Sequence, residues 1–286
     1  MPTDPGYWKA WKHASLPVLR RTFALLTARL RGGLHPIQRQ AVMGTRPNLT
    51  LSAASPTDLQ AQLRAIDIAV PLVSEGRTKE HREQYMMARL LATMAKAGQL
   101  EFPLKLVHSE KPDFTLFLAG VELGAECVEA VPPEHYHIEN IRERLHPDAM
   151  NFGQKFEPGE QNFTWKEKHE IASGERAGPP WMPAAMRRNW VAAMEYVIAG
   201  KTAKLRKGNY SAHVTNWLLV QDEWPNALHF YPERVREAAG ELLVRLEPLL
   251  SPPAFQSIFI ASGNQLLCFQ KGRLHVEEIC NLWQDG

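Results

Sequence analysis

The chain has 286 residues, of which 44% are hydrophobic and 22% are charged, as in ordinary globular proteins with a sizeable core. No apolar run approaches the ~18–20 residues that span a bilayer, and three scattered cysteines without a CxxC pair exclude a disulfide framework and a zinc ribbon. We therefore expect a reduced, cytoplasmic protein without a membrane partner.

The first 50 residues concentrate positive charge. They hold eight Lys and Arg against one acid, Asp4, a net charge of +7, while the rest of the chain carries −5. The stretch SLPVLRRTFALLTARLRGGLHP predicts a basic amphipathic helix that ends at Gly32 and Gly33. We assign residues 1–57 to a basic N-terminal helical arm, which either binds a polyanion or docks on an acidic surface of its own chain.

Residues 58–286 are assigned to a second unit, which begins with two helices and three strands. TDLQAQLRAIDIAV predicts a short helix, and TKEHREQYMMARLLATMAKAG predicts a long one with Thr78 as its N-cap. The apolar stripe of the long helix, extended backwards, passes through Glu83 and Glu80, so these acids lie on or near its inward face. Three strand-like runs follow: FPLKLVH, DFTLFLA and VELGAECVEAV.

The second half of this unit alternates helices and strands. IENIRERL predicts a helical turn or two, and residues from about 147 to 185 predict a loop-rich insertion without a clear period. MRRNWVAAMEYVIAGKTAKLRKG predicts a second long helix, and HVTNWLLVQDEW predicts a buried strand. A helix at about 231–249 and the strands FQSIFIAS and NQLLCFQ end the chain. This order predicts an α/β domain whose mixed central sheet has helices on both faces.

Carboxylates lie in the predicted hairpin where core residues are expected. With a two-residue turn at 119–120, Asp113 lies opposite Glu126 with Cβ atoms about 4.5–5.5 Å apart, and Glu129 points to the other face. Like charges at this spacing repel unless a cation lies between them, so the pair predicts a Mg²⁺ site that would also take Mn²⁺. Alternatively, Asp113 ends a turn after Pro112 and Glu126 pairs with an Arg or Lys.

These residues resemble the PD-(D/E)xK phosphodiesterase superfamily, whose members have the restriction-endonuclease-like fold. The resemblance lies in PDF at 112–114, GAECVEA at 124–130 and KEHREQ at 79–84, within the order helix, three strands, helix, strand. It implies an αβββαβ core and a Mg²⁺-dependent endonuclease that acts on nucleic acid, which we take to be DNA rather than RNA. The sequence leaves a homodimer open.

The resemblance also implies roles for individual residues. Asp113, Glu126 and the main-chain carbonyl of Cys127 would be the metal ligands. Glu83, or else Glu80, would be the helix acid that assists them.

Val128 departs from the superfamily's pattern, because it lies where these nucleases carry their lysine. The inward stripe of the second long helix continues from Trp190 to Lys201 and Lys204, which offers a relocated amine. Lys201 is the first choice, Lys204 the second, and Lys105 on the preceding strand the third. Without such an amine, the chain would be a non-cleaving nucleic-acid-binding relative. A third interpretation is an interaction or immunity-type protein that shares only the α/β layout.

The basic arm generates the first testable prediction. The expected contacts to the nucleic-acid backbone are Arg20, Arg21, Arg29, Arg31 and Lys204. Replacing the four arginines with Gln should weaken DNA binding and flatten the fall of log K with log salt, by roughly 0.9 for each B-DNA phosphate that the arm no longer neutralises. Titration of labelled DNA across a salt series measures this slope. An unchanged slope would assign the arm to another task, such as docking on its own chain.

Overall fold

The computed structural model describes residues 48–72, 75–149, 154–159, 162–179, 182–208 and 213–283. Residues Arg46–Gly286 belong to one structural unit, and the fold below is that of its described part. The helix predicted in the basic arm lies outside the described residues, as do the arm residues Arg20, Arg21, Arg29 and Arg31.

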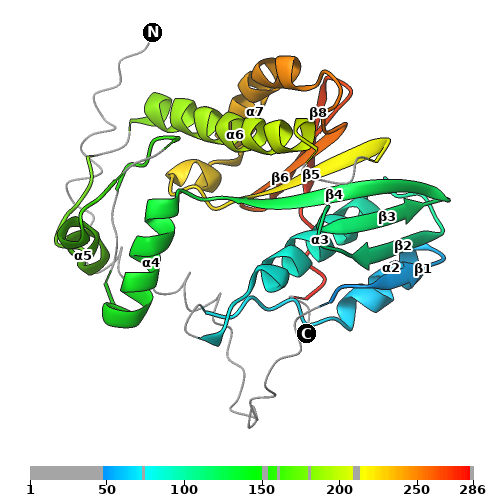
Figure 1. Cartoon of the computed structure of the whole chain (residues 1–286), viewed down its shortest axis with the longest axis horizontal. Helices are drawn as coiled ribbons and strands as arrows, with labels where there is room; N and C mark the ends of the chain where they lie inside the picture. The colour runs from blue at the N-terminus through cyan, green and yellow to red at the C-terminus, as the bar shows by residue number, and fades with distance from the viewer. Residues whose placement is uncertain are drawn as a thin grey trace, which may run out of the picture. The chain divides into compact units, whose positions relative to one another are not determined.

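A mixed sheet of eight strands in sequential order forms the centre of this unit (Figure 1). Strands β4, β5 and β6 are parallel to one another, and all other neighbours are antiparallel. This architecture confirms the predicted α/β class and the mixed sheet. The strands are β1 (Leu51–Ala53), β2 (Leu104–His108), β3 (Phe114–Leu118), β4 (Val121–Ala130), β5 (Thr215–Asp222), β6 (Ser257–Ser262), β7 (Gln265–Gln270) and β8 (Arg273–Glu278).

Helices cover both faces of the sheet (Figure 1). Helices α2 and α3 pack on one face, and α6 and α7 pack on the other. None of the helices in the described part is long and apolar enough to cross a membrane. The helices are α2 (Pro56–Arg64), α3 (Lys79–Lys96), α4 (Pro133–Leu145), α5 (Trp165–Ser173), α6 (Pro183–Arg206), α7 (Pro232–Leu246) and the short 3-10 turns η3 (Ala227–Phe230) and η4 (Glu247–Leu249).

Most elements lie where the sequence predicts them, and a few differ. Helix α4 begins at Pro133, five residues before the helical turns predicted at IENIRERL. The segment 147–185, predicted to be loop, contains α5, which has a capping box between Thr164 and Glu167 and ends at Gly174 in the left-handed conformation. Strands β1 and β8 were not predicted, because one has three residues and the other is a polar edge strand. β1 and the start of α2 fall within the segment 1–57 that the sequence assigned to the arm.

The β3–β4 hairpin determines where the candidate site forms. Its ladder runs from Leu118–Val121 to Phe114–Ala125, which confirms the predicted two-residue turn and register. β4 has ten residues and β3 has five, so β4 continues beyond the start of β3. Residues 126–130 pair with β5 on one edge, and within the described residues no strand pairs with their other edge. Side chains from other elements can therefore reach the main chain there.

Candidate functional site

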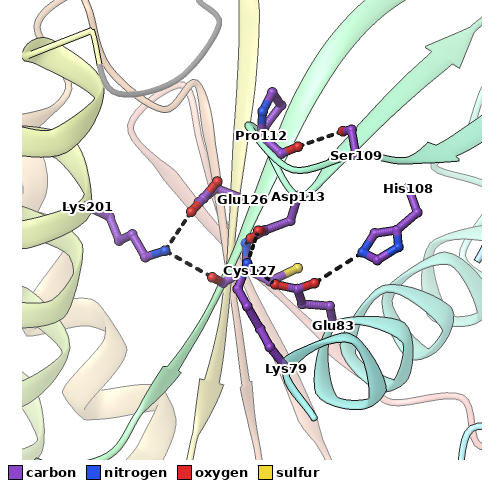
Figure 2. Close-up of polar contacts among 9 residues, drawn as sticks. All are labelled: Lys79, Glu83, His108, Ser109, Pro112, Asp113, Glu126, Cys127 and Lys201. Atoms are coloured by element: carbon purple, nitrogen blue, oxygen red, sulfur yellow. Dashed lines mark hydrogen bonds and ion pairs between the residues drawn. The ribbon is translucent and has the colours of Figure 1, made fainter. Parts of the chain in front are cut away.

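Asp113 lies immediately before β3 and reaches the unpaired edge of β4 (Figure 2). Its side chain is buried, and Oδ2 accepts a hydrogen bond from the main-chain N–H of Cys127 at 2.8 Å. Gly124 allows the residue before Asp113 to pack closely, since a Cβ there would lie 2.9 Å from Cγ of Pro112. The main-chain carbonyl of Pro112 accepts a hydrogen bond from the Ser109 hydroxyl at 2.6 Å. These contacts fix the carboxylate against the strand.

Glu126 lies on β4, and its partner comes from α6. In Figure 2, α6 and α3 lie on opposite sides of the cluster. Lys201 of α6 donates hydrogen bonds to Oε1 of Glu126 at 2.7 Å and to the main-chain carbonyl of Cys127 at 3.1 Å. The Lys201 side chain is 15% exposed, so the structure places this ammonium inward, where the helical stripe predicts it. Oε2 of Glu126 is buried and has no hydrogen-bond partner within the described residues.

A third carboxylate, that of Glu83 on α3, is joined to this pair by Lys79. The ammonium of Lys79 lies 2.5 Å from Oε1 of Glu83 and 2.6 Å from Oδ1 of Asp113. Oε2 of Glu83 lies 3.2 Å from Nε2 of His108 at the end of β2. Glu83 was the first choice for the helix acid, and these contacts place it in the cluster (Figure 2).

The other candidate amines lie elsewhere. Lys204 is exposed near the end of α6. Lys105 is exposed on β2, and its ammonium lies 5.7 Å from the centre of the Phe117 ring. Val128 packs against the core on the α6 side of the sheet, so its side chain contributes only apolar contact. Of the three lysines named from the sequence, Lys201 is the one with a contact to the carboxylates.

The cluster holds more negative than positive charge, and the pKa values reflect this. Burial, followed by the charge of Glu126, raises the pKa of Asp113 to about 6. Burial alone would raise the pKa of Glu83, but hydrogen bonds with His108 and Lys79 outweigh it and lower that pKa. Burial opposes the charge of Lys79, yet its bonds to Asp113 and Glu83 raise its pKa. Three carboxylates therefore share two ammonium groups, Lys79 and Lys201.

The donors present fit a hard divalent cation. Within the described residues no three side chains of His, Cys, Asp or Glu are arranged to hold a metal ion. The available set is instead two carboxylates, Asp113 and Glu126, and the carbonyl of Cys127, all oxygen donors of the kind that Mg²⁺ prefers. Carboxylate and carbonyl oxygens have more than one acceptor position, and Oε2 of Glu126 has no partner in this part of the chain.

Sequence reasoning missed two members of the cluster, Lys79 and His108. Lys79 lies four residues before Glu83 on the same helix, a spacing that brings an ammonium and a carboxylate together on one helix face. That spacing could have identified it. His108 reaches Glu83 across 25 residues of sequence, and no local pattern indicates such a contact.

No family model matches this sequence, and comparisons with curated proteins and with solved structures likewise gave no match. What the site can do therefore follows from its own contacts and from the order of the elements that carry them.

The pKa of Asp113 generates a prediction about stability. This pKa is about 6 in the folded protein against an ordinary value of 3.8, so the folded state holds more protons between these pH values. The stability that Asp113 contributes is fully present below about pH 4 and is lost as the pH rises through about 6. Asp113→Asn has no such loss. The difference in free energy of unfolding, Asp113→Asn minus the unchanged chain, should therefore increase by roughly 1–3 kcal/mol from pH 4 to pH 7 in metal-free buffer.

Urea denaturation of both proteins across this pH range measures the difference. Parallel curves would mean that Lys79 neutralises the charge of Asp113 completely, which would make the two residues a structural ion pair.

Proposed function

We propose that this chain is a metal-dependent nuclease with a restriction-endonuclease-like core. The observation that carries the proposal is a set of hydrogen bonds at Cys127. Asp113 accepts from its main-chain N–H, and Lys201 donates both to its carbonyl and to Glu126. The order of elements supports it, because α3, β2, β3, β4, α6 and β5 follow the helix, three strands, helix and strand of the resembled superfamily. Helices α4 and α5 are inserted between β4 and α6.

Asp113, Glu126 and the carbonyl of Cys127 would hold a Mg²⁺ or Mn²⁺ ion. When bound, such an ion neutralises charge on a phosphate and lowers the pKa of a water molecule. The buried oxygen of Glu126 without a partner supports this assignment, as does the excess negative charge that raises the pKa of Asp113.

Lys201 would supply the amine that Val128 cannot. Its ammonium is mostly buried and hydrogen-bonded to Glu126 and to Cys127, so it is held beside the proposed metal ligands. In that position it would stabilise negative charge that develops on a phosphate, and such preorganised charge is a large term in many enzymes. Lys79 and Glu83 would hold Asp113 in place from the other side.

One observation favours a second function, that of a non-cleaving nucleic-acid-binding relative. Lys79 and Lys201 already pair with all three carboxylates, as they would in a buried ionic cluster that serves only the fold. In that case the chain would bind DNA in a salt-dependent manner and leave it intact. An interaction protein of the third kind would show no salt-dependent binding at all.

Cleavage of supercoiled plasmid in Mg²⁺ or Mn²⁺ separates these functions. Lys201→Met removes the ammonium and keeps an unbranched stem in its place. The cleavage rate should fall by roughly 10²–10³, as on loss of one electrostatic stabiliser. Binding of Mn²⁺, measured by calorimetry, should survive because the lysine is not a ligand.

Lys207→Met is the matched control, since Lys207 is exposed just after α6 and has no place in the site. Circular dichroism at the assay temperature verifies that both variants are folded. If Lys201→Met cleaves as fast as the unchanged chain, Lys201 takes no part in catalysis. Failure of the unchanged chain to cut in either metal would favour the non-cleaving binder.

A further inference from the structure

A cavity of about 670 Å³ opens beside the candidate site, at the carboxyl ends of β4 and β5. Helices α3 and α4 line its other sides, and an ion pair of 3.8 Å joins Arg77, in the segment before α3, to Glu143 of α4. Its volume is within the ~300–1,000 Å³ typical of small-molecule sites. Nothing in the proposed cleavage chemistry uses this space.

The charges of the cavity wall argue against an anionic ligand. Its two arginines, Arg77 and Arg82, are already paired with Glu143 and Glu129. Glu223, just after β5, also lines the cavity and has no ion-pair partner within the described residues. Its carboxylate is solvent-accessible and accepts one hydrogen bond from Gln221 at 3.0 Å. The wall therefore offers a carboxylate acceptor and leaves no unpaired arginine for a phosphate.

The wall also contains polar atoms that the protein itself does not satisfy. Nε of Arg77, Nε of Arg82, Nδ1 of His135 and Oε2 of Glu143 are buried without a hydrogen-bond partner in the described part of the chain. These atoms are shielded from solvent, so they lie behind the cavity surface, and Arg77, Arg82 and Glu143 already have ion-pair partners. The carboxylate of Glu223, in contrast, lies on the surface that an occupant can reach.

Aromatic side chains complete the wall. Tyr85 of α3, Tyr136 of α4 and Trp283 near the C-terminal end of the described chain all line the cavity. Aromatic faces favour a flat ligand, because a planar ring system stacks on them. A flat ligand that is not an anion and that carries a hydrogen-bond donor on its edge has the chemistry of a nucleobase with an exocyclic amine.

We propose that this cavity binds a single nucleobase that carries an exocyclic amine, with the amine directed at Glu223. The preference for a nucleobase over other flat polar molecules rests on the proposed nuclease function. A carboxylate accepts from the exocyclic amine of cytosine in known recognition patterns. Thymine lacks an exocyclic amine, so it gives Glu223 no such donor. The cavity therefore discriminates against thymine.

The cavity and the candidate site share two walls. On α3, Glu83 faces the carboxylate cluster and the neighbouring Arg82 faces the cavity. On β4, Glu126 lies in the cluster and Glu129 lies in the cavity, three residues or roughly 10 Å along the strand. A base held in the cavity would lie beside the candidate site. Such a base would have to leave its stack, as in enzymes that extrude a base into a pocket.

Binding of free nucleosides to the full chain in metal-free buffer tests the proposal independently of cleavage. Quenching of tryptophan fluorescence, supported by saturation-transfer NMR, gives the affinities of guanosine, adenosine, cytidine and thymidine. At least one amino nucleoside should bind about tenfold or more tightly than thymidine. Glu223→Gln should remove that preference, and Glu278→Gln, which changes an exposed carboxylate on β8, should retain it.

A second variant tests the cavity at another residue, in case Glu223→Gln fails to fold. Tyr136→Ala should weaken binding of all four nucleosides together, because it removes a stacking surface. No nucleoside binding, equal binding of all four, or an unchanged preference in Glu223→Gln would each overturn the proposal. Binding of spermidine in place of nucleosides would also overturn it and would make the cavity a cation site. Because no metal or cleavage is involved, a failed plasmid assay leaves this result unaffected.

Discussion

Two buried carboxylates, Asp113 and Glu126, face each other across the start of the β3–β4 hairpin, and the site is built around their repulsion. Both side chains are almost fully shielded from solvent, so each needs a positive partner inside the protein. Lys79 of α3 approaches from one side and Lys201 of α6 from the other. Side chains from two helices that cover opposite faces of the sheet therefore converge on the Asp113–Glu126 pair.

This meeting is possible because β4 is longer than β3. Where β3 is absent, the N–H and C=O of Cys127 are left for side chains, and Asp113 and Lys201 take them. A ladder extended by two residues would fill that edge and exclude both. The same extension of β4 carries Glu129 into the neighbouring cavity, so one feature of the sheet generates both the carboxylate cluster and the cavity.

The sequence predicted those features that depend on local patterns. The two-residue turn determined the hairpin register, and the helical stripe ending in Lys201 placed that ammonium at Glu126. Contacts between distant segments were not predictable, such as Lys79 with Asp113, 34 residues apart, because no periodicity encodes them. The cavity is assembled from residues between positions 67 and 283, so it becomes visible only once the chain is folded. Strands β1 and β8 are too short or too polar to give a clear alternating pattern.

A crystal structure of the full chain grown with Mn²⁺ would show whether the carboxylate pair holds a metal, because anomalous scattering locates the ion itself. We expect a peak bonded to the carboxylates of Asp113 and Glu126 and to the carbonyl of Cys127. Asp113→Asn crystals grown in the same way should lose the peak. Absence of any peak at this edge of β4, with Lys201 still bound to Glu126 and Lys79 still bound to Asp113, would show that this cluster is not a metal site. The cluster would then be a structural ionic network.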